Sequence, residues 1–256
     1  MISTLASDAD LTCDAFLGGL LQIWQPAKGY RAGVDPVLLA ASVPAKPGQS
    51  VLELGCGVAT AALCLAARVP GLQLTGVELQ ADYADLARRN AAENGTEMQV
   101  VTGDLAQMPQ ALRAQSFDHV IANPPYFQRA HGTPACDSGR ESALGEGVSL
   151  AHWMDTAIRR LKPKGRLAMI QRAERLPDLL AASDARIGDL TVLPIAPRQG
   201  RKAELVILQA RKGGKGRFRL LAPLVMHQGA RHIADGESYT EQVNGILRHG
   251  KPLMVE

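Results

Sequence analysis

The chain has 256 residues, of which 46% are hydrophobic and 21% are charged. This composition is typical of a folded globular protein and excludes a wholly disordered chain, while the length fits one large domain. The formal net charge is +3, from 28 basic and 25 acidic residues, which permits a polyanionic partner but does not by itself predict one.

The start of the chain, MISTLASDADLTCDAF, lacks a basic segment followed by an apolar one, so we expect no secretory signal. No apolar run approaches the ~18 to 20 residues that cross a bilayer. The four cysteines form no CxxC pair and have no zinc-like spacing with a histidine, which predicts no structural metal site. A reducing cytoplasm is the expected location.

Short apolar strand candidates alternate with helix candidates from residue 50 onward. The predicted strands are residues 50–55, 73–79, 98–104, 117–122, 165–170, 190–195 and 203–209, and the clearest predicted helices are residues 59–69 and 81–95. The spacing of about 20 to 25 residues per strand-helix unit predicts an α/β fold with a doubly wound, mostly parallel sheet of seven strands. The last two strands leave little room for a helix, which predicts a hairpin and one antiparallel edge strand.

Three successive predicted strands end in residues suited to a nucleoside. The first runs into Gly55 and Gly57, which let the backbone approach a ligand closely. Glu78 ends the second strand, where a carboxylate can bind a ribose diol, and Asp104 ends the third, where it can bind an adenine amine. The alternative is that Glu78 and Asp104 only cap the helices that follow. Because parallel strand ends line one crevice, the three together favour a nucleoside site.

The glycine loop departs from the dinucleotide pattern. A pyrophosphate site wants Gly-x-Gly-x-x-Gly, but the chain has Ala59 where a further glycine is usual, and Glu53 lies two residues before Gly55. A carboxylate there would repel a pyrophosphate but suit an amino group. A ligand with an ammonium group and a nucleoside is therefore expected, and S-adenosylmethionine fits. The predicted cofactor-binding residues are Glu53, Gly55, Cys56, Gly57, Glu78, Leu79, Asp104, Leu105 and Asn123.

These motifs, together with Asn123-Pro124-Pro125-Tyr126 after the fourth strand, resemble class I S-adenosylmethionine-dependent methyltransferases. Residues 53–57 are similar to the first motif of that fold, and Glu78 and Asp104 lie at its second and third. Residues 123–126, the NPPY motif, resemble the fourth, which is found in methyltransferases acting on adenine N6, cytosine N4 or a glutamine amide. The resemblance implies a Rossmann-like fold and amino-group chemistry.

The closer similarity is to the bacterial tRNA(Val) adenine-N6 methyltransferase family, and it extends from Leu17 onward. Residues 29–42, 150–170 and 238–247 carry it, beside the glycine loop and the NPPY motif. The resemblance implies an RNA-binding enzyme of tRNA processing. Residues 50–256 of the chain would form the methyltransferase core.

The resemblance also implies that residues 1–49 form a segment that covers the cofactor site. Arg31 and Asp35 are then possible contacts to cofactor or substrate. Asp35 followed by Pro36 is equally typical of a helix start, with Asp as the N-cap and Pro at the first position. Both interpretations of Asp35 stay open.

The NPPY motif suits transfer to an exocyclic amine, whose lone pair is delocalised into the ring. The Asn123 amide oxygen and the Pro124 carbonyl can accept the two amine hydrogens and localise that lone pair, while the Tyr126 ring can stack on a flipped base. Pro124 and Pro125 stiffen the corner. The alternative is a turn that merely ends the strand. No metal is required.

A basic segment near the C-terminus is a candidate phosphate-binding rim for RNA. Its predicted RNA-binding residues are Arg198, Arg201, Lys202, Arg211, Lys212, Lys215 and Arg217, with Arg219 beside them. A solvated hairpin is an equal alternative. The long connection 127–148 is typical of a functional or disordered loop. We interpret His131, His152 and Trp153 as loop and helix-packing residues.

Three other functions remain as alternatives. Protein glutamine-N5 methyltransferases share the NPPY motif but carry a helical substrate domain before the core, whereas only 50 residues precede Val51 here. DNA adenine-N6 methyltransferases normally need a sizeable target-recognition region, and neither residues 127–148 nor the C-terminal segment looks large enough. A non-catalytic cofactor-binding or RNA-binding module is disfavoured by the intact Asn123.

Overall fold

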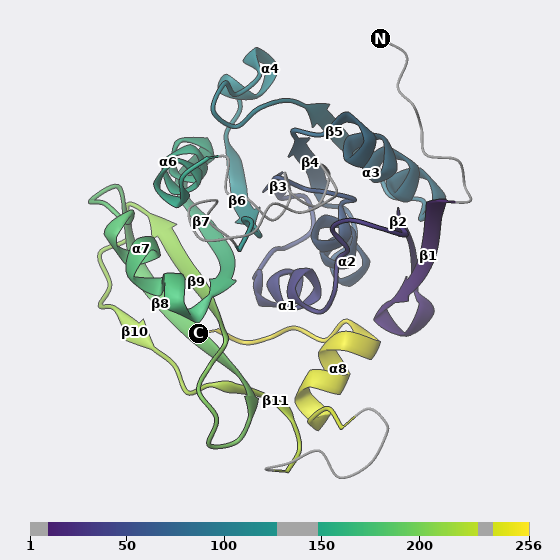
Figure 1. Cartoon of the computed structure of the whole chain (residues 1–256). Coiled ribbons are helices and arrows are strands. Elements are labelled where there is room, and N and C mark those ends of the chain that lie inside the picture. The colour runs from purple at the N-terminus through teal and green to yellow at the C-terminus, as the bar shows by residue number, and fades with distance from the viewer. Residues whose placement is uncertain (1–9, 127–147, 230–237, 256) are drawn as a thin grey trace.

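The computed structural model describes residues 10–126, 148–229 and 238–255. Its main strands are β3 (Ser50–Leu54), β4 (Gln73–Glu78), β5 (Met98–Thr102), β6 (Phe117–Ala122), β7 (Leu161–Arg172), β8 (Ile187–Arg198), β9 (Leu205–Lys212), β10 (Arg219–Leu220) and β11 (Leu224–His227). They form one sheet in the order β10-β8-β9-β7-β6-β3-β4-β5, with β11 also paired to β8 (Figure 1). The seven predicted strands are confirmed as β3 to β9.

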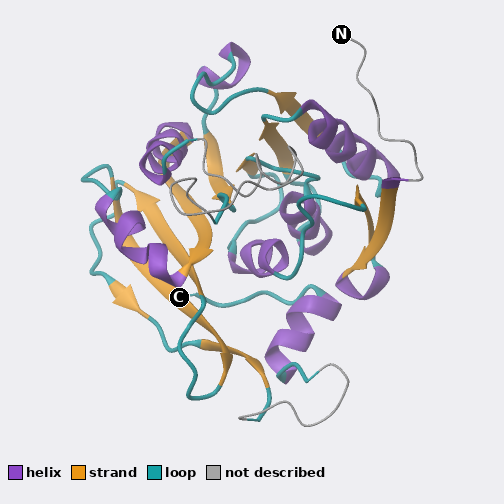
Figure 2. Ribbon diagram, in the orientation of Figure 1, coloured by secondary structure: helices purple, strands orange, loops and turns teal. Residues whose placement is uncertain are grey.

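Helices cover both faces of the sheet (Figure 2). They are α1 (Asp35–Ser42), α2 (Thr60–Arg68), α3 (Ala81–Glu93), α4 (Gln110–Arg113), α6 (Leu150–Arg160), α7 (Leu176–Ala181) and α8 (Glu241–His249), with short 3-10 turns η2 (Leu17–Gly19) and η4 (Ala173–Arg175). Buried side chains of α1, α2, α3 and α8 form one core, and those of α4, α6 and α7 form a second core. Every residue of β3 is buried because both of its faces are covered. No helix in the described part of the chain is both long enough and apolar enough to cross a bilayer.

The sheet differs from the prediction in the place of its antiparallel strand. β9 is antiparallel to both β7 and β8 and lies between them rather than at an edge. The predicted hairpin is present, but its second strand pairs with β7 and leaves β8 outside. β10 and β11 then run parallel to β8 along its free side, so the sheet has nine strands instead of seven.

A separate hairpin of β1 (Leu11–Phe16) and β2 (Leu21–Pro26) packs beside α3. Two asparagines at the end of α3 bond the free side of β2. The side chain of Asn90, in the last turn, exchanges hydrogen bonds with the backbone of Trp24, and that of the C-cap residue Asn94 does so with the backbone of Gln22. An isolated two-stranded hairpin is marginal in water, so these bonds help to fix it. The hairpin thereby sets where the following segment, residues 27–34, crosses toward α1.

Candidate functional site

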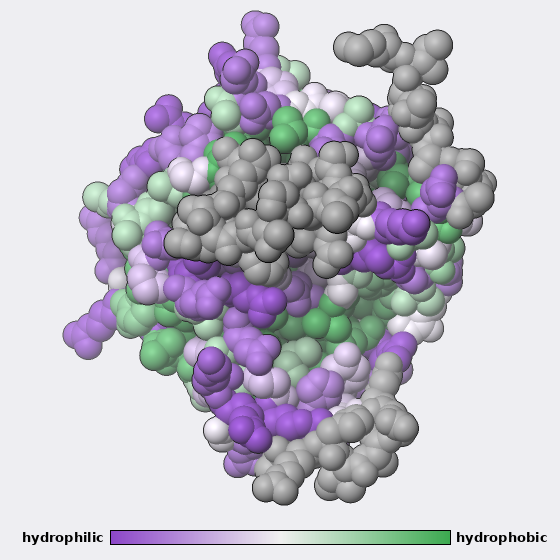
Figure 3. Space-filling view, viewed as in Figure 1, coloured by the Kyte–Doolittle hydropathy of each residue, from purple (hydrophilic) through white to green (hydrophobic). Residues whose placement is uncertain are grey.

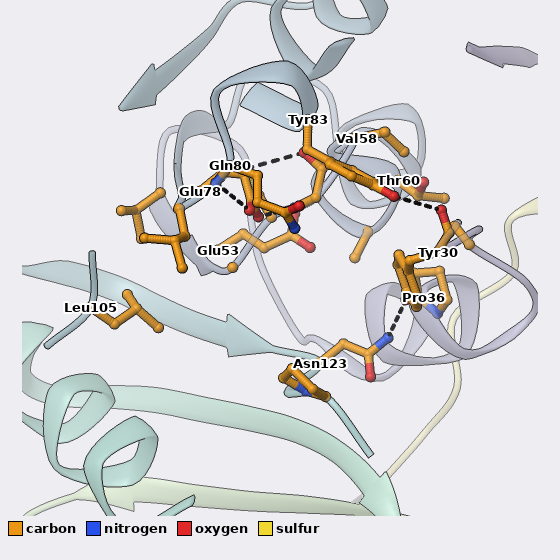
Figure 4. A pocket seen from close by; sticks show the side chains of 18 of the residues that line it. Tyr30, Pro36, Glu53, Val58, Thr60, Glu78, Gln80, Tyr83, Leu105 and Asn123 are labelled. Atoms are coloured by element: carbon orange, nitrogen blue, oxygen red, sulfur yellow. Dashed lines mark hydrogen bonds between the residues drawn. The ribbon is translucent and has the colours of Figure 1, made fainter. Parts of the chain in front are cut away.

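A cavity opens at the carboxyl ends of β3, β4 and β6 (Figure 4). β4 and β6 flank β3 on opposite sides, so the order of the sheet reverses direction there. Such a switch point leaves a crevice at the strand ends and is the usual ligand site of open α/β sheets. Of the nine predicted cofactor-binding residues, all nine line this cavity: Glu53, Gly55, Cys56, Gly57, Glu78, Leu79, Asp104, Leu105 and Asn123.

The glycine loop between β3 and α2 is a left-handed turn. Gly55, Gly57 and Ala59 all have positive φ, at 59°, 54° and 68°. A Cβ added to Gly55 would lie 2.5 Å from Cη2 of Trp153, which reaches the cavity from α6. Trp153 therefore packs, as predicted, but it also walls the cavity. No local pattern indicates this, because the two residues are about a hundred positions apart in the chain.

The carboxylates of the cavity are bonded to backbone amides. Glu53 is 4% exposed and accepts a hydrogen bond from Ala62 N–H at 3.0 Å, and its burial raises its pKa to about 8. Glu78 accepts from Gly57 N–H at 2.8 Å and from Gln80 N–H at 2.9 Å, and burial raises its pKa as well. Glu78 therefore lines the cavity but does not cap α3, whose N-cap residue is Gln80 and has no side-chain capping bond.

Asp104, two residues after β5, does not cap the next helix either, because the N-cap residue of α4 is Pro109. Its Oδ1 accepts from Ala106 N–H at 2.8 Å, while the residue lines the cavity. The described residues that line the cavity include three carboxylates and neither lysine nor arginine. This electrostatic environment suits a cationic ligand and disfavours a pyrophosphate.

Asn123 stands where β6 ends, beside the cavity (Figure 4). Its Nδ2 donates to the Tyr30 hydroxyl at 3.4 Å, and no described residue donates to its Oδ1. Tyr30 belongs to the segment before α1 and lines the cavity together with Ala32 and Pro36. Among the described residues, the amide oxygen of Asn123 is thus left without a hydrogen-bond donor, and the residue lines the cavity.

The carbonyls of the NPPY corner are held by a residue that the sequence did not single out. Gln171 is fully buried on β7, and its Nε2 donates to the carbonyls of Pro124 at 3.3 Å and Pro125 at 3.4 Å. Its Oε1 accepts from Arg172 N–H at 2.8 Å. Prolines supply no N–H to continue a ladder with β7, and the glutamine side chain bridges this interruption.

Tyr126 is bonded to the start of α1. Its hydroxyl donates to the Asp35 carboxylate, and the Arg172 guanidinium lies 5.1 Å from its ring centroid. The Tyr126 phenol is a protonated donor at neutral pH, and burial raises its pKa further above the ordinary value. α1 does begin at Asp35, but the Asp35 side chain makes no capping bond. Its partner is Tyr126, and neither earlier interpretation anticipated that contact.

Arg31 does not line the cavity. Its guanidinium donates to Asp14 at 2.6 Å and to the Pro26 carbonyl at 3.0 Å, both in the β1–β2 hairpin. The structure therefore gives Arg31 a role in joining the hairpin to the segment that follows it.

The seven basic residues of the predicted rim do not lie together. Arg198 is the last residue of β8, and Arg201 and Lys202 lie in the turn after it, at the same edge of the sheet as Asn123. β9 then runs back across the sheet, so Arg211, Lys212, Lys215 and Arg217 lie at the opposite edge. Two of these four are also engaged: Lys212 donates to the carbonyls of Ile158 and Leu161, and Arg211 pairs with Asp189 at 3.7 Å.

Two further predictions concern other residues. The connection 127–148, with His131, lies outside the described residues except for Val148, which lines the cavity. His152 lies on α6, and its Nε2 is 3.1 Å from the carbonyl of Leu105. The described residues hold no group of three or more His, Cys, Asp or Glu side chains suited to a metal ion.

Residues 32–183 match the family described as the methyltransferase small domain. The chain belongs to this family. The tRNA1(Val) (adenine(37)-N6)-methyltransferase of Porphyromonas gingivalis is 33% identical over 175 residues, which are 65% of this chain and 68% of that protein. The enzyme of the same name from Dickeya chrysanthemi is 30% identical over 199 residues, or 75% and 77% of the two chains.

The solved structures agree. A predicted O-methyltransferase from Agrobacterium tumefaciens superposes with a TM-score of 0.69 and 27% identity, covering 86% of this chain and 98% of that one. The predicted class I methyltransferase fold and the resemblance are confirmed, and the methyltransferase uses S-adenosylmethionine. The cavity fits this cofactor, because carboxylates line it without a basic side chain and the glycine turn leaves its backbone accessible.

Proposed function

We propose that this methyltransferase modifies the N6 amine of an adenine in RNA, and that the RNA is a tRNA. The observation that carries the proposal is the corner formed by Asn123 and Pro124, which stands beside a cavity suited to a cationic nucleoside cofactor. The curated relatives that match the chain are named as adenine-N6 methyltransferases of tRNA1(Val), which supports the same substrate. A tRNA substrate implies the cytoplasm.

The roles of the residues follow from their chemistry. When bound, the cofactor supplies an electrophilic methyl group. Glu53 would hold the ammonium group of the cofactor, whose positive charge would favour the ionised carboxylate over the protonated form. Glu78 and Asp104 would accept hydrogen bonds from the ribose and the adenine amine. Residues 1–49 would cover the site, since Tyr30 and Pro36 already form part of its wall.

Asn123 and Pro124 would present the target base. Both offer oxygen acceptors. The hydrogen bond that Asn123 donates to Tyr30 and the one that Pro124 accepts from Gln171 keep those groups in place before the substrate arrives. Acceptors positioned in advance cost little reorganisation during the reaction. Tyr126, fixed by Asp35, offers the face of its ring opposite Arg172 for stacking on the base.

The test is methyl transfer from labelled S-adenosylmethionine to three substrates in separate reactions: an unmodified tRNA1(Val) transcript, duplex DNA and a glutamine-containing peptide. N6-methyladenosine from the tRNA alone is expected. Label in the DNA or the peptide alone contradicts the substrate class. Asn123→Ala should lower kcat by about 100-fold or more, while cofactor affinity measured by calorimetry stays within about threefold. A parallel loss of cofactor affinity contradicts the role of Asn123.

A further inference from the structure

The NPPY corner carries a positive charge that the proposed reaction does not use. Arg172 is the last residue of β7 and is half-buried, with its guanidinium beside the Tyr126 ring. No described carboxylate forms an ion pair with Arg172. The nearby carboxylate of Asp35 is engaged by the Tyr126 hydroxyl. A guanidinium next to the base-binding ring, without a counter-ion in the described structure, indicates an anionic ligand.

Two more cations lie along the same edge of the sheet. Arg172 pairs with Leu205 of β9, and Leu205 pairs with Ile195 of β8, so the turn that follows β8 projects from the edge where β7 ends. This turn carries Arg201 and Lys202, both exposed. Neighbouring strands are about 4.8 Å apart, which places β8 about 10 Å across the sheet from β7. Hydrophilic residues gather at this turn in the lower part of Figure 3.

Arg198 is different from these three. Its guanidinium donates to the carbonyls of Gln228 and Gly229 and to the Ser238 hydroxyl, so it ties β8 to the residues after β11. Its hydrogen-bonding capacity is largely used within the protein. Arg198 is therefore left out of the set.

A nucleotide whose base enters the site brings its phosphates with it. A flipped base stays attached to its backbone, and phosphate contacts from arginine and lysine fix the register of the strand. We infer that Arg172, Arg201 and Lys202 bind phosphates of the RNA strand that flanks the target adenine, with Arg172 next to the flipped nucleotide. The inference rests on the proposed function and names the part of the substrate that this edge recognises.

The opposite edge of the sheet offers a matched control. Lys215 and Arg217 are exposed, and they come from the same basic segment of the sequence. They lie near Asp189, which accepts a hydrogen bond from Gly216 N–H at the far end of β8. Removing their charges changes the net charge as much as removing Arg201 and Lys202, but at the edge away from Asn123.

The experiment measures binding of an unmodified tRNA1(Val) transcript between 50 and 200 mM KCl. Each lost phosphate contact should reduce the slope of log K against log salt by about 0.7 to 0.9. At 0.15 M salt, that corresponds to a Kd about four to six times higher for Arg172→Gln. The Arg201→Gln/Lys202→Gln double variant should lose about twice as much slope, and Arg172→Lys should keep most of it.

The control pair distinguishes phosphate binding at a local site from a general electrostatic attraction between the RNA and the protein. Lys215→Gln/Arg217→Gln should change Kd less than twofold and leave the slope unchanged. An equal loss in this pair overturns the inference. So does an unchanged slope in Arg172→Gln, which would limit Arg172 to packing on Tyr126. If the wild type does not methylate RNA, the proposed function is contradicted instead. The two failures are distinguishable because methyl transfer tests the function, whereas the salt dependence of binding tests the phosphate contacts.

Discussion

Replacing Gly55 by alanine tests how the glycine loop is shaped. Gly55 has φ of 59°, where an alanine costs about 1 to 2 kcal/mol relative to its preferred conformations. The new Cβ would lie 2.5 Å from Trp153 Cη2, about 1 Å inside an ordinary contact. Overpacking of this kind costs about 1 to 3 kcal/mol. We expect Gly55→Ala to lower the free energy of unfolding by about 2 to 5 kcal/mol.

Urea unfolding of a double-mutant cycle with Trp153→Phe separates the two costs. Phenylalanine lacks the outer ring atoms, so Gly55→Ala should cost about 1 to 3 kcal/mol less in that background. Gly57→Ala is the control: its φ is 54°, but an added Cβ meets no described atom within 4 Å. It should cost about 1 to 2 kcal/mol and be additive with Trp153→Phe to within about 0.5 kcal/mol. If Gly55→Ala and Gly57→Ala lower the free energy of unfolding equally, and both are additive with Trp153→Phe, the packing argument is refuted.

Two further variants probe buried polar groups. Because the pKa of Glu53 is about 8 when folded and about 4.3 when unfolded, the folded protein binds the extra proton between these values and loses stability as pH rises. Urea unfolding should show that the free energy of unfolding of the wild type, relative to that of Glu53→Gln, falls by about 1 kcal/mol per pH unit from pH 5 to 8. A difference that stays constant with pH contradicts the raised pKa. Gln171→Met leaves the carbonyls of Pro124 and Pro125 without their donor and should lower kcat well beyond any change in cofactor affinity. Gln209→Met, which also removes a buried glutamine donor, should lower stability alone. Equal kcat losses for the two glutamines would contradict a role at the corner.

The strand-end residues of the site were predictable because the fold itself places them. Apolar strands alternating with helices predict a parallel sheet, and in such a sheet the ends of neighbouring strands meet at one edge. Glu53, Glu78, Asp104 and Asn123 each lie at or just after a strand end, so their convergence needed no long-range information. That rule located one whole side of the cavity.

The remaining contacts depend on pairings that no local pattern encodes. Trp153 reaches Gly55, and Gln171 reaches Pro124, only because α6 and β7 pack where they do. The hairpin of β8 and β9 was predictable from its short connection. Which of its strands would pair with β7 was not, since both carry similar apolar residues.

The same hairpin explains why adjacency in the sequence misled the prediction of the basic rim. β9 has eight residues and spans about 27 Å, so it separates Lys202 at its start from Lys215 beyond its end. Only the first group shares an edge with the NPPY corner. Within that edge the charges are divided further: the cavity is lined by carboxylates, and the cations Arg172 and Arg201 stand outside it. This division attracts a polyanionic strand to the edge that carries Arg172 and Arg201, and it repels the phosphates of that strand from the cofactor cavity. The neutral base is therefore the part of the substrate that is favoured to approach Asn123.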